Sequence, residues 1–239
     1  PQTKQIFVTG STSQEELERK LYMVRKKIEN SISKSNISKE RSFYIVSLST
    51  KQMIYKGMLT SLQLREYFPD LSDKNFTSGI ALVHSRFSTN TFPTWDLAQP
   101  FRMMGHNGEI NTIRGNRQWM ESRESVLKSD QLGNLNDLYP IVQPGMSDSA
   151  SLDNVLEFLV MSGKSLPHAM AMLVPESWNQ KNPISDNLRA FYEYTATAME
   201  AWDGPAAVSL TDGRHIGCLI DRNGLRPSKY VITKDDKLY

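Results

Sequence analysis

The middle of the chain has helical periodicity and its ends have strand-like runs. This order constrains the fold more than any other feature of the sequence. Between residues 113 and 201, apolar residues recur every three or four positions, which is typical of helices with one buried face. Towards the end of the chain, two strand-like runs flank Asp212-Gly213, a strong β-hairpin signal. We therefore expect an α+β fold, with helices packed on the faces of a mostly antiparallel sheet.

The predicted helices follow from apolar spacing and from their start and stop residues. The first begins at Ser13, which has Glu16 three residues later as in a capping box. Its apolar stripe is formed by Leu17, Leu21, Val24 and Ile28. The others are expected over residues 59–68, 113–127, 152–160 before Gly163, 166–173 before Pro175, and Asn187–Ala201.

The predicted strands are short apolar or alternating runs bounded by turn residues. They are expected over Ser42–Ser49, Gln52–Gly57, a buried run at 78–87, the two arms of the hairpin at 206–210 and 215–220, and 229–233. We find no internal repeat, no low-complexity segment and no linker in the sequence. Residues 1–239 are therefore expected to belong to a single domain.

Charge and cysteine content exclude several classes of protein. The net charge is only +2 and the charges are interleaved along the chain, so we expect no nucleic-acid partner. No apolar run approaches the roughly 18 residues that span a bilayer, so we expect no membrane segment. The single cysteine, Cys218, fits a reducing compartment, and its strand-like surroundings predict a buried structural thiol.

Three polar positions could together recognise an amino acid. Arg86 lies at the end of the run at 78–87 and could pair bidentately with a carboxylate, the alternative being a surface or structural ion pair. Asn107 and Gly108 could donate to an oxyanion, the alternative being an ordinary Asn-Gly turn. Asp148 could hold an ammonium group, the alternative being an N-cap. The set suits a small zwitterion whose side-chain amide is cleaved, yet the histidines and Cys218 suggest no nucleophile with a base and no metal site.

The motifs resemble those of one family. The run HSRFSTNTFPTWDLAQPFRMMGHNGEINTIRGN, with SDSASLD, LVPESW and WDGPAAVSLTDGRHIGCLIDRNGLRP, is similar to the glutamine amidotransferase domain of the glutamate synthase family. The likeness extends over nearly the whole chain. It implies a class II amidotransferase with the four-layer αββα sandwich of the N-terminal-nucleophile hydrolases.

The resemblance also implies roles for the four residues. Arg86 would bind the carboxylate of L-glutamine, Asp148 its amino group, and Asn107 with Gly108 the oxyanion. The family nucleophile is a cysteine at the mature N-terminus, which we expect upstream of Pro1. This chain is therefore expected to be part of one amidotransferase domain and inactive alone, with no cofactor of its own.

The rest of the enzyme is expected downstream of Tyr239. FMN and an iron–sulfur cluster would lie there, in the synthase domains of the same chain, and would use the ammonia to convert 2-oxoglutarate to glutamate. The electron donor would be ferredoxin or an NADPH-dependent small subunit, and the compartment bacterial cytoplasm or plastid stroma. Two alternatives remain open from the sequence: another class II amidotransferase, or a non-catalytic module that senses glutamine or serves as a scaffold.

Overall fold

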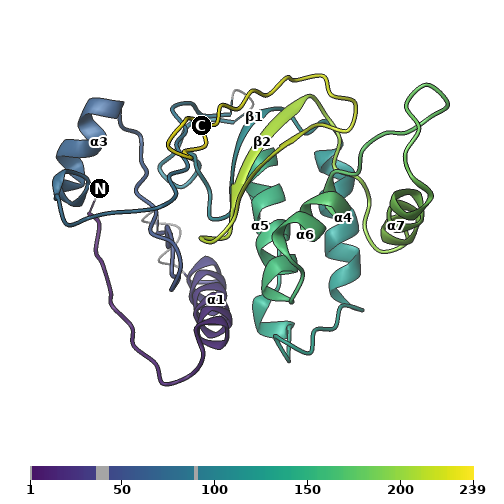
Figure 1. Cartoon of the computed structure of the whole chain (residues 1–239). Coiled ribbons are helices and arrows are strands. Elements are labelled where there is room, and N and C mark those ends of the chain that lie inside the picture. Colours follow the sequence, from purple (N-terminus) through teal and green to yellow (C-terminus); the bar gives the residue numbers. More distant parts are fainter. Residues whose placement is uncertain (1, 36–42, 89–90) are drawn as a thin grey trace.

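The computed structural model describes residues 2–35, 43–88 and 91–239, and within them helices surround a small antiparallel sheet (Figure 1). The helices are α1 (Gln14–Ser33), α3 (Ser61–Tyr67), α4 (Ile113–Glu124), α5 (Asp148–Met161), α6 (Leu166–Leu173) and α7 (Asp186–Ala196), with the short 3-10 helices η1 (Pro69–Ser72) and η2 (Asn136–Leu138). The strands are β1 (Met104–Gly108), β2 (Ala206–Thr211) and β3 (Ile216–Ile220). The α+β class is confirmed. The four-layer sandwich remains a prediction, because the described residues form a single sheet.

The sheet has the order β1-β2-β3, and both neighbouring pairs are antiparallel. β2 and β3 form the predicted hairpin, whose turn is stabilised by Asp212 Oδ1, which accepts from the backbone N–H groups of Arg214 and His215. β1 pairs with β2 across almost 100 residues of sequence, with His106 opposite Val208. The stretch between β1 and β2 forms α4 to α7.

The core lies between the sheet and α5 and α6, which lie below the sheet in the view of Figure 1. Leu152, Val155 and Leu156 on α5 are fully buried, and Val208 of β2 is 1% exposed. Each large aliphatic side chain buried in this way contributes about 1.5–3 kcal/mol. The helices predicted over 113–127, 152–160 and 166–173 are thus confirmed, and α7 ends at Ala196, earlier than the predicted Ala201.

The buried face of α1 differs from the predicted apolar stripe. Ser13 does cap the helix by accepting from Glu16 N, but Val24 and Ile28 are 48% and 38% exposed. The helix instead buries Leu21 together with polar residues, which are Glu18, Tyr22, Arg25, Lys26 and Asn30. The prediction was wrong because these polar groups find partners in distant parts of the chain.

An ion network explains how α1 buries charge. Arg25, 1% exposed, donates to Glu29 at 2.8 Å and to Glu157 of α5 at 2.6 Å. Arg102 also donates to Glu29, at 2.7 Å. Burial alone would lower the pKa of Arg25, but the two carboxylates more than offset it and raise the pKa. Buried charges are tolerated only when they are paired in this way.

Three of the predicted strands, those over Ser42–Ser49, Gln52–Gly57 and 78–87, do not form among the described residues. The described residues 43–57 and 78–87 have extended or irregular backbone without strand pairing, and Ser42 lies outside the described residues. Val83, expected in a buried strand, is 81% exposed. Residues 229–233 pair only with the end of the chain, through a bridge between Ile232 and Leu238. A strand exists only where another backbone satisfies its hydrogen bonds, and residues 43–57 and 78–87 have no such neighbour among the described residues.

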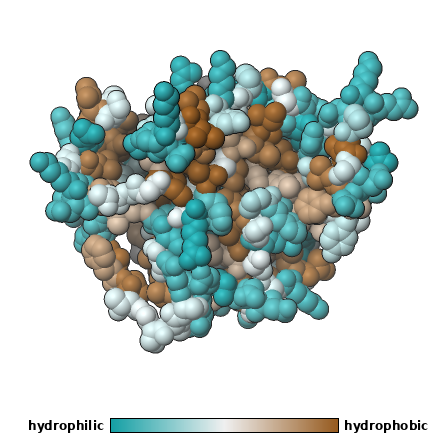
Figure 2. Space-filling view, viewed as in Figure 1, coloured by the Kyte–Doolittle hydropathy of each residue, from teal (hydrophilic) through white to brown (hydrophobic). Residues whose placement is uncertain are grey.

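The face of the sheet that α5 and α6 do not cover is partly exposed. Ile216 and Ile220 of β3 are 44% and 42% exposed, and apolar side chains interrupt the hydrophilic surface on the upper part of the molecule (Figure 2). Cys218 lies on this face, is exposed, and has its Sγ 3.0 Å from Ser228 Oγ. The expectation of a buried thiol was therefore wrong. The alternation in β3 was read correctly, but the helices cover the opposite face.

Within the described parts of the chain, none of the helices combines the length and the apolar character needed to cross a lipid bilayer. The longest, α1, has charged residues on both its buried and its exposed faces. Its exposed side carries ion pairs such as Lys20 with Glu16.

Candidate active site at the open edge of β1

The register of the sheet shows which backbone groups of β1 face away from β2. Glu109 N donates to Pro205 O at 3.0 Å, just beyond the strand. At the other end, Thr211 N donates to Met103 O at 2.8 Å. In an antiparallel ladder, hydrogen-bonded and non-hydrogen-bonded residue pairs alternate. The odd-numbered residues of β1 therefore bond to β2, and the even-numbered residues direct their N–H and C=O groups to the open edge. The N–H of Gly108 therefore points away from the sheet.

The two edge N–H groups on either side of Gly108 have partners. His106 N donates to Gln99 Oε1 at 2.6 Å. Ile110 N donates to Asp148 Oδ2 at 2.8 Å. Between them, no described residue accepts from the N–H of Gly108. Between His106 and Ile110, the edge thus presents an open donor at Gly108, the position where the sequence predicts an oxyanion hole.

Asn107 places a side-chain amide beside this donor. The residue is exposed and sits on the sheet face opposite to that of buried His106, because successive side chains of a strand alternate. Its position at the end of a strand contradicts the alternative of an ordinary Asn-Gly turn. A backbone N–H and an amide group on consecutive residues could both donate to one oxygen atom.

Two glycines allow the chain to adopt this arrangement. Gly108 has φ +152°, and a Cβ added to it would lie 2.0 Å from Pro205 O. Gly204 has φ +150°, and a Cβ there would lie 1.9 Å from Glu109 O. Side chains at either position would push the two backbones apart. Gly108 therefore has a structural role that is independent of catalysis.

Asp148 lies at the first position of α5. The N-cap is Ser147, whose hydroxyl accepts from Ala150 N at 3.1 Å, so the N-cap alternative for Asp148 is wrong. The carboxylate is 7% exposed, and its Oδ1 accepts from Ser149 N at 2.7 Å while Oδ2 accepts from Ile110 N. These contacts fix a negative charge next to the end of β1.

Arg86 lies in the middle of a short stretch that is attached to the site at both ends. At one end, His84 Nε2 donates to His106 O at 3.0 Å. At the other, Ser88 Oγ donates to Asp148 Oδ1 at 3.4 Å. Arg86 itself is exposed, and its backbone N–H donates to His84 Nδ1 at 3.1 Å. The structure thus brings the Arg86 stretch alongside β1 and Asp148, although the expected strand before it is absent.

His106 is buried beneath the site with 2% exposure, and neither ring nitrogen has a partner among the described residues. Burial lowers the pKa of its imidazole. The charge of Asp148 opposes this effect, whereas the charge of Arg226 adds to it. A lowered pKa favours the neutral imidazole, so His106 itself adds no positive charge beneath Asn107 and Gly108.

The sequence analysis did not predict one residue that contacts the site. Arg226 NH1 donates to Asn107 Oδ1 at 2.6 Å, across 119 residues of sequence. Arg226 belongs to the run DRNGLRP, which was read only as a turn and as a motif of the resemblance. The presence of an arginine in a motif that begins directly after β3 was the signal that could have pointed to the site.

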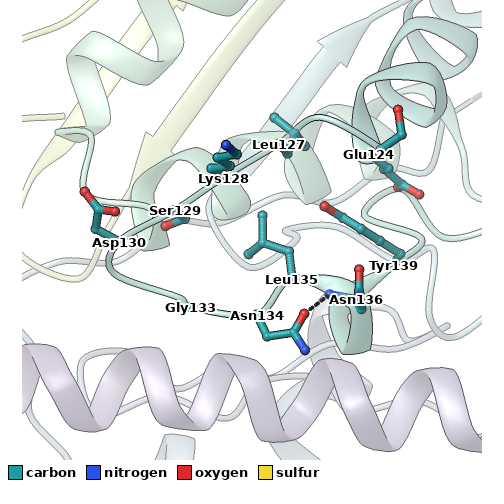
Figure 3. A pocket seen from close by; sticks show the side chains of 11 residues that line it. Glu124, Leu127, Lys128, Ser129, Asp130, Gly133, Asn134, Leu135, Asn136 and Tyr139 are labelled. Atoms are coloured by element: carbon teal, nitrogen blue, oxygen red, sulfur yellow. Dashed lines mark hydrogen bonds between the residues drawn. The ribbon is translucent and has the colours of Figure 1, made fainter.

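A separate cleft of about 450 Å³ lies at the end of α4 (Figure 3). Leu135 and Tyr139 extend towards its interior, and Lys128 and Asp130 lie at its rim. Its half-buried carboxylate, Glu124, already has a hydrogen-bond partner, because Oε1 accepts from Ile141 N at 2.7 Å. Neither Asn107 nor Asp148 nor any other predicted site residue lines this cleft.

Comparison with known families identifies the class. The family described as glutamine amidotransferases class-II matches residues 1–239. The chain therefore belongs to the class-II glutamine amidotransferases, the class that the resemblance predicted. The open donor at Gly108, the amide of Asn107 and the carboxylate of Asp148 lie together in a member of this family.

The individual relatives that the chain resembles include several glutamate synthases. The chain is 48% identical over 240 residues to the glutamate synthase [NADPH] large chain of Bacillus subtilis, covering 99% of this chain and 16% of the relative. It is 51% identical over 220 residues to glutamate synthase [NADH] of Saccharomyces cerevisiae, covering 91% and 10%. It is 49% identical over 222 residues to the ferredoxin-dependent glutamate synthase of Antithamnion sp., covering 92% and 14%. The chain thus spans a small part of the length of the relatives it matches.

Proposed function

We propose that this chain forms the glutamine-binding wall and the oxyanion hole of a glutaminase domain, and that the full-length protein is a glutamate synthase. The observation that carries the proposal is the open N–H of Gly108 beside the amide of Asn107. Hydrolysis of an amide passes through a tetrahedral intermediate with a negatively charged oxygen. Donors fixed in advance around that oxygen lower the barrier, and loss of one such donor lowers kcat by about 10²–10³-fold in other enzymes.

Arg86 and Asp148 are proposed to orient L-glutamine. The Arg86 guanidinium would pair with the α-carboxylate, for which its planar fork is suited. The Asp148 carboxylate would hold the α-ammonium group. A carboxylate accepts about four hydrogen bonds, and the contacts of Asp148 with Ile110, Ser149 and Ser88 leave room for one more donor. With both ends of the substrate held, its side-chain amide would extend towards Asn107 and Gly108.

The nucleophile is proposed to lie outside these residues. The one cysteine, Cys218, sits on β3, separated from β1 by β2. Its register partner is Ser209, which pairs with Gly105 and not with Asn107. We therefore assign attack on the amide to a cysteine elsewhere in the full-length protein, with its α-amino group as base, and expect no hydrolysis by residues 1–239 alone.

The remaining chemistry is assigned to other domains. An iron–sulfur cluster needs about four cysteine thiolates, and this chain has one cysteine, so its residues do not fit the cluster. No group of histidine, cysteine or acidic residues among the described ranges suits a metal ion. The relatives' names include NADPH, NADH and ferredoxin at nearly equal identity, so we place the choice of electron donor outside this domain. Ammonia released here would be passed to 2-oxoglutarate in the full-length enzyme.

The test is glutamate release from L-glutamine by the full-length protein and its Arg86→Ala variant. Loss of the charged contact to the α-carboxylate should raise KM by about tenfold to a thousandfold. Arg189→Ala is the matched control, because Arg189 is exposed on α7, away from β1. The control should keep the wild-type KM.

The outcomes separate the alternatives. A raised KM in Arg86→Ala alone supports the glutaminase and the assigned role. Turnover with an unchanged KM keeps the glutaminase and removes Arg86 from the site. Binding of glutamine without turnover in the wild-type protein would argue for a sensing module instead.

A further inference from the structure

Among the described residues, Arg226 is the one charged side chain that hydrogen-bonds to Asn107, a residue that we place in the oxyanion hole. Arg226 NH1 lies 2.6 Å from Asn107 Oδ1, a short distance typical of a charge-assisted bond. Arg226 is half-buried, whereas Asn107 is exposed. The guanidinium thus reaches from the turn after β3 across the end of the sheet to β1.

The backbone that carries Arg226 is held firmly in place. Asp221 follows β3, is 5% exposed, and accepts from Asn223 N, Leu225 N and Arg226 N at 3.0–3.1 Å. Its Oδ2 also accepts from Ala206 N at 3.1 Å, which ties the turn to β2. Burial works against the charge of Asp221, but these N–H donors keep the pKa of its carboxyl below the usual value.

The bond determines which atom of the Asn107 amide is available to a substrate. Arg226 is a donor without any acceptor capacity, so it selects the carbonyl oxygen Oδ1. The NH₂ group of Asn107 then points away from Arg226, and no described residue accepts from it. The positive charge of Arg226 next to Oδ1 also draws electron density from the amide and makes its N–H groups stronger donors.

From this geometry we propose that Arg226 is a positioning residue for glutamine hydrolysis. It orients the Asn107 amide and polarises it, so that Nδ2 and the Gly108 N–H face the same developing oxyanion. The inference rests on the proposed function, because it assigns Arg226 a task within that same site. Arg226 acts through Asn107 and needs no contact with the substrate.

The test is a double-mutant cycle in the full-length protein, with glutamate release from L-glutamine as the readout. Arg226→Ala should lower kcat by about 10–100-fold, less than full loss of an oxyanion donor, and leave KM within about threefold. Asn107→Ala should lower kcat at least as much. Because both changes remove the same interaction, Arg226→Ala should lower kcat less than about twofold further in the Asn107→Ala background.

A conservative variant guards against a simple folding defect. Arg226→Lys keeps a positive donor but loses the planar fork, so it should recover part of the kcat lost in Arg226→Ala. The melting temperature of each variant is measured alongside. If Arg226→Ala unfolds, the same comparison is made between Arg226→Lys and wild type, where a lower kcat with unchanged KM supports the inference and an unchanged kcat overturns it.

The results distinguish failure of this inference from failure of the proposed function. Full activity in Asn107→Ala overturns the oxyanion-hole assignment, and the inference with it. If Asn107→Ala greatly lowers kcat while Arg226→Ala keeps the wild-type kcat, only the role of Arg226 is overturned. A raised KM at constant kcat in Arg226→Ala, or effects that multiply in the double variant, would show that Arg226 contacts the substrate or acts independently, and would also overturn it.

Discussion

Asp148 Oδ2 accepts a hydrogen bond from Ile110 N at 2.8 Å, which joins the first turn of α5 to the chain just beyond β1. This contact places a carboxylate from one part of the sequence next to the donors of another. It also orients the carboxylate, since Oδ1 accepts from Ser149 N on the other side. The negative charge is thus fixed where the ammonium group of an amino acid is expected to bind.

Asp148→Asn tests this role with little change of shape. The amide oxygen of asparagine can still accept from Ile110 N, but its NH₂ group cannot accept from Ser149 N, and the negative charge is lost. We expect KM for L-glutamine to rise by about tenfold or more, because a buried charged contact to the ammonium group disappears. Steady-state kinetics of the full-length protein would show this. Asp235→Asn, which removes an exposed charge paired with Lys237, is the control, and equal KM values in both variants would refute the assignment.

Gly108→Ala tests the structural role of this glycine. At φ +152° an alanine is strained by about 1–3 kcal/mol, and its Cβ would meet Pro205 O at 2.0 Å. We expect a clear loss of stability in thermal or denaturant unfolding. Gly115→Ala is the control, because Gly115 lies in α4 with no atom within 4 Å of an added Cβ. That change should stabilise the helix by about 0.5–1 kcal/mol, so a Gly108→Ala variant as stable as the control would contradict the structure.

Local patterns in the sequence predicted much of the fold. The helices over 152–160 and 166–173 were found because apolar spacing is a property of a few consecutive turns. The hairpin was found because Asp212-Gly213 sits between two alternating runs. Residues 43–57 and 78–87 were assigned wrongly, since a strand depends on a partner that apolar content alone does not reveal.

Long-range pairing explains the other errors. α1 buries Arg25 because Glu157, 132 residues away, neutralises it. The spacing of apolar residues within α1 cannot reveal a partner that lies so far away in the sequence. Cys218 alternates as predicted, but alternation does not say which face the helices cover. The roles of Arg86, Asn107, Gly108 and Asp148 were derived from residue chemistry and the resemblance. The structure brings their backbone segments together, and the roles themselves stay predictions.

His84 supports the Arg86 stretch through both ring nitrogens. Nδ1 accepts from Arg86 N and Nε2 donates to His106 O, so the bonds require a neutral ring with its proton on Nε2. His84→Ala removes both bonds, and we expect KM for L-glutamine to rise more than kcat falls, because Arg86 loses its support. The kinetics of His215→Ala, an exposed histidine of the β2–β3 turn, provide the control. A His84→Ala enzyme with wild-type KM would show that the stretch is held by other contacts.

Lys26 makes the attachment of α1 depend on pH. It is 3% exposed, and its Nζ donates to Pro140 O at 2.7 Å and to Ile141 O at 3.0 Å. Burial, with the nearby charge of Arg25, lowers its pKa from 10.5 to about 7. The folded state therefore favours the neutral amine, and between about pH 7 and pH 10 the unfolded chain binds more protons. Stability should rise with pH through this window, by at most about 1.4 kcal/mol per pH unit, and fall as the pH drops towards 7.

Amide hydrogen exchange of α1, corrected for intrinsic rates, would measure this dependence in the full-length protein. The free energy of opening should be higher at pH 9 than at pH 7 in the wild type. In Lys26→Met the difference should shrink, because the titrating group is gone. Lys27→Met removes an exposed lysine paired with Asp137 and should keep the wild-type slope. If Lys26→Met and wild type respond to pH alike, then Lys26 stays protonated in the fold and its two carbonyl partners are sufficient to hold the charge.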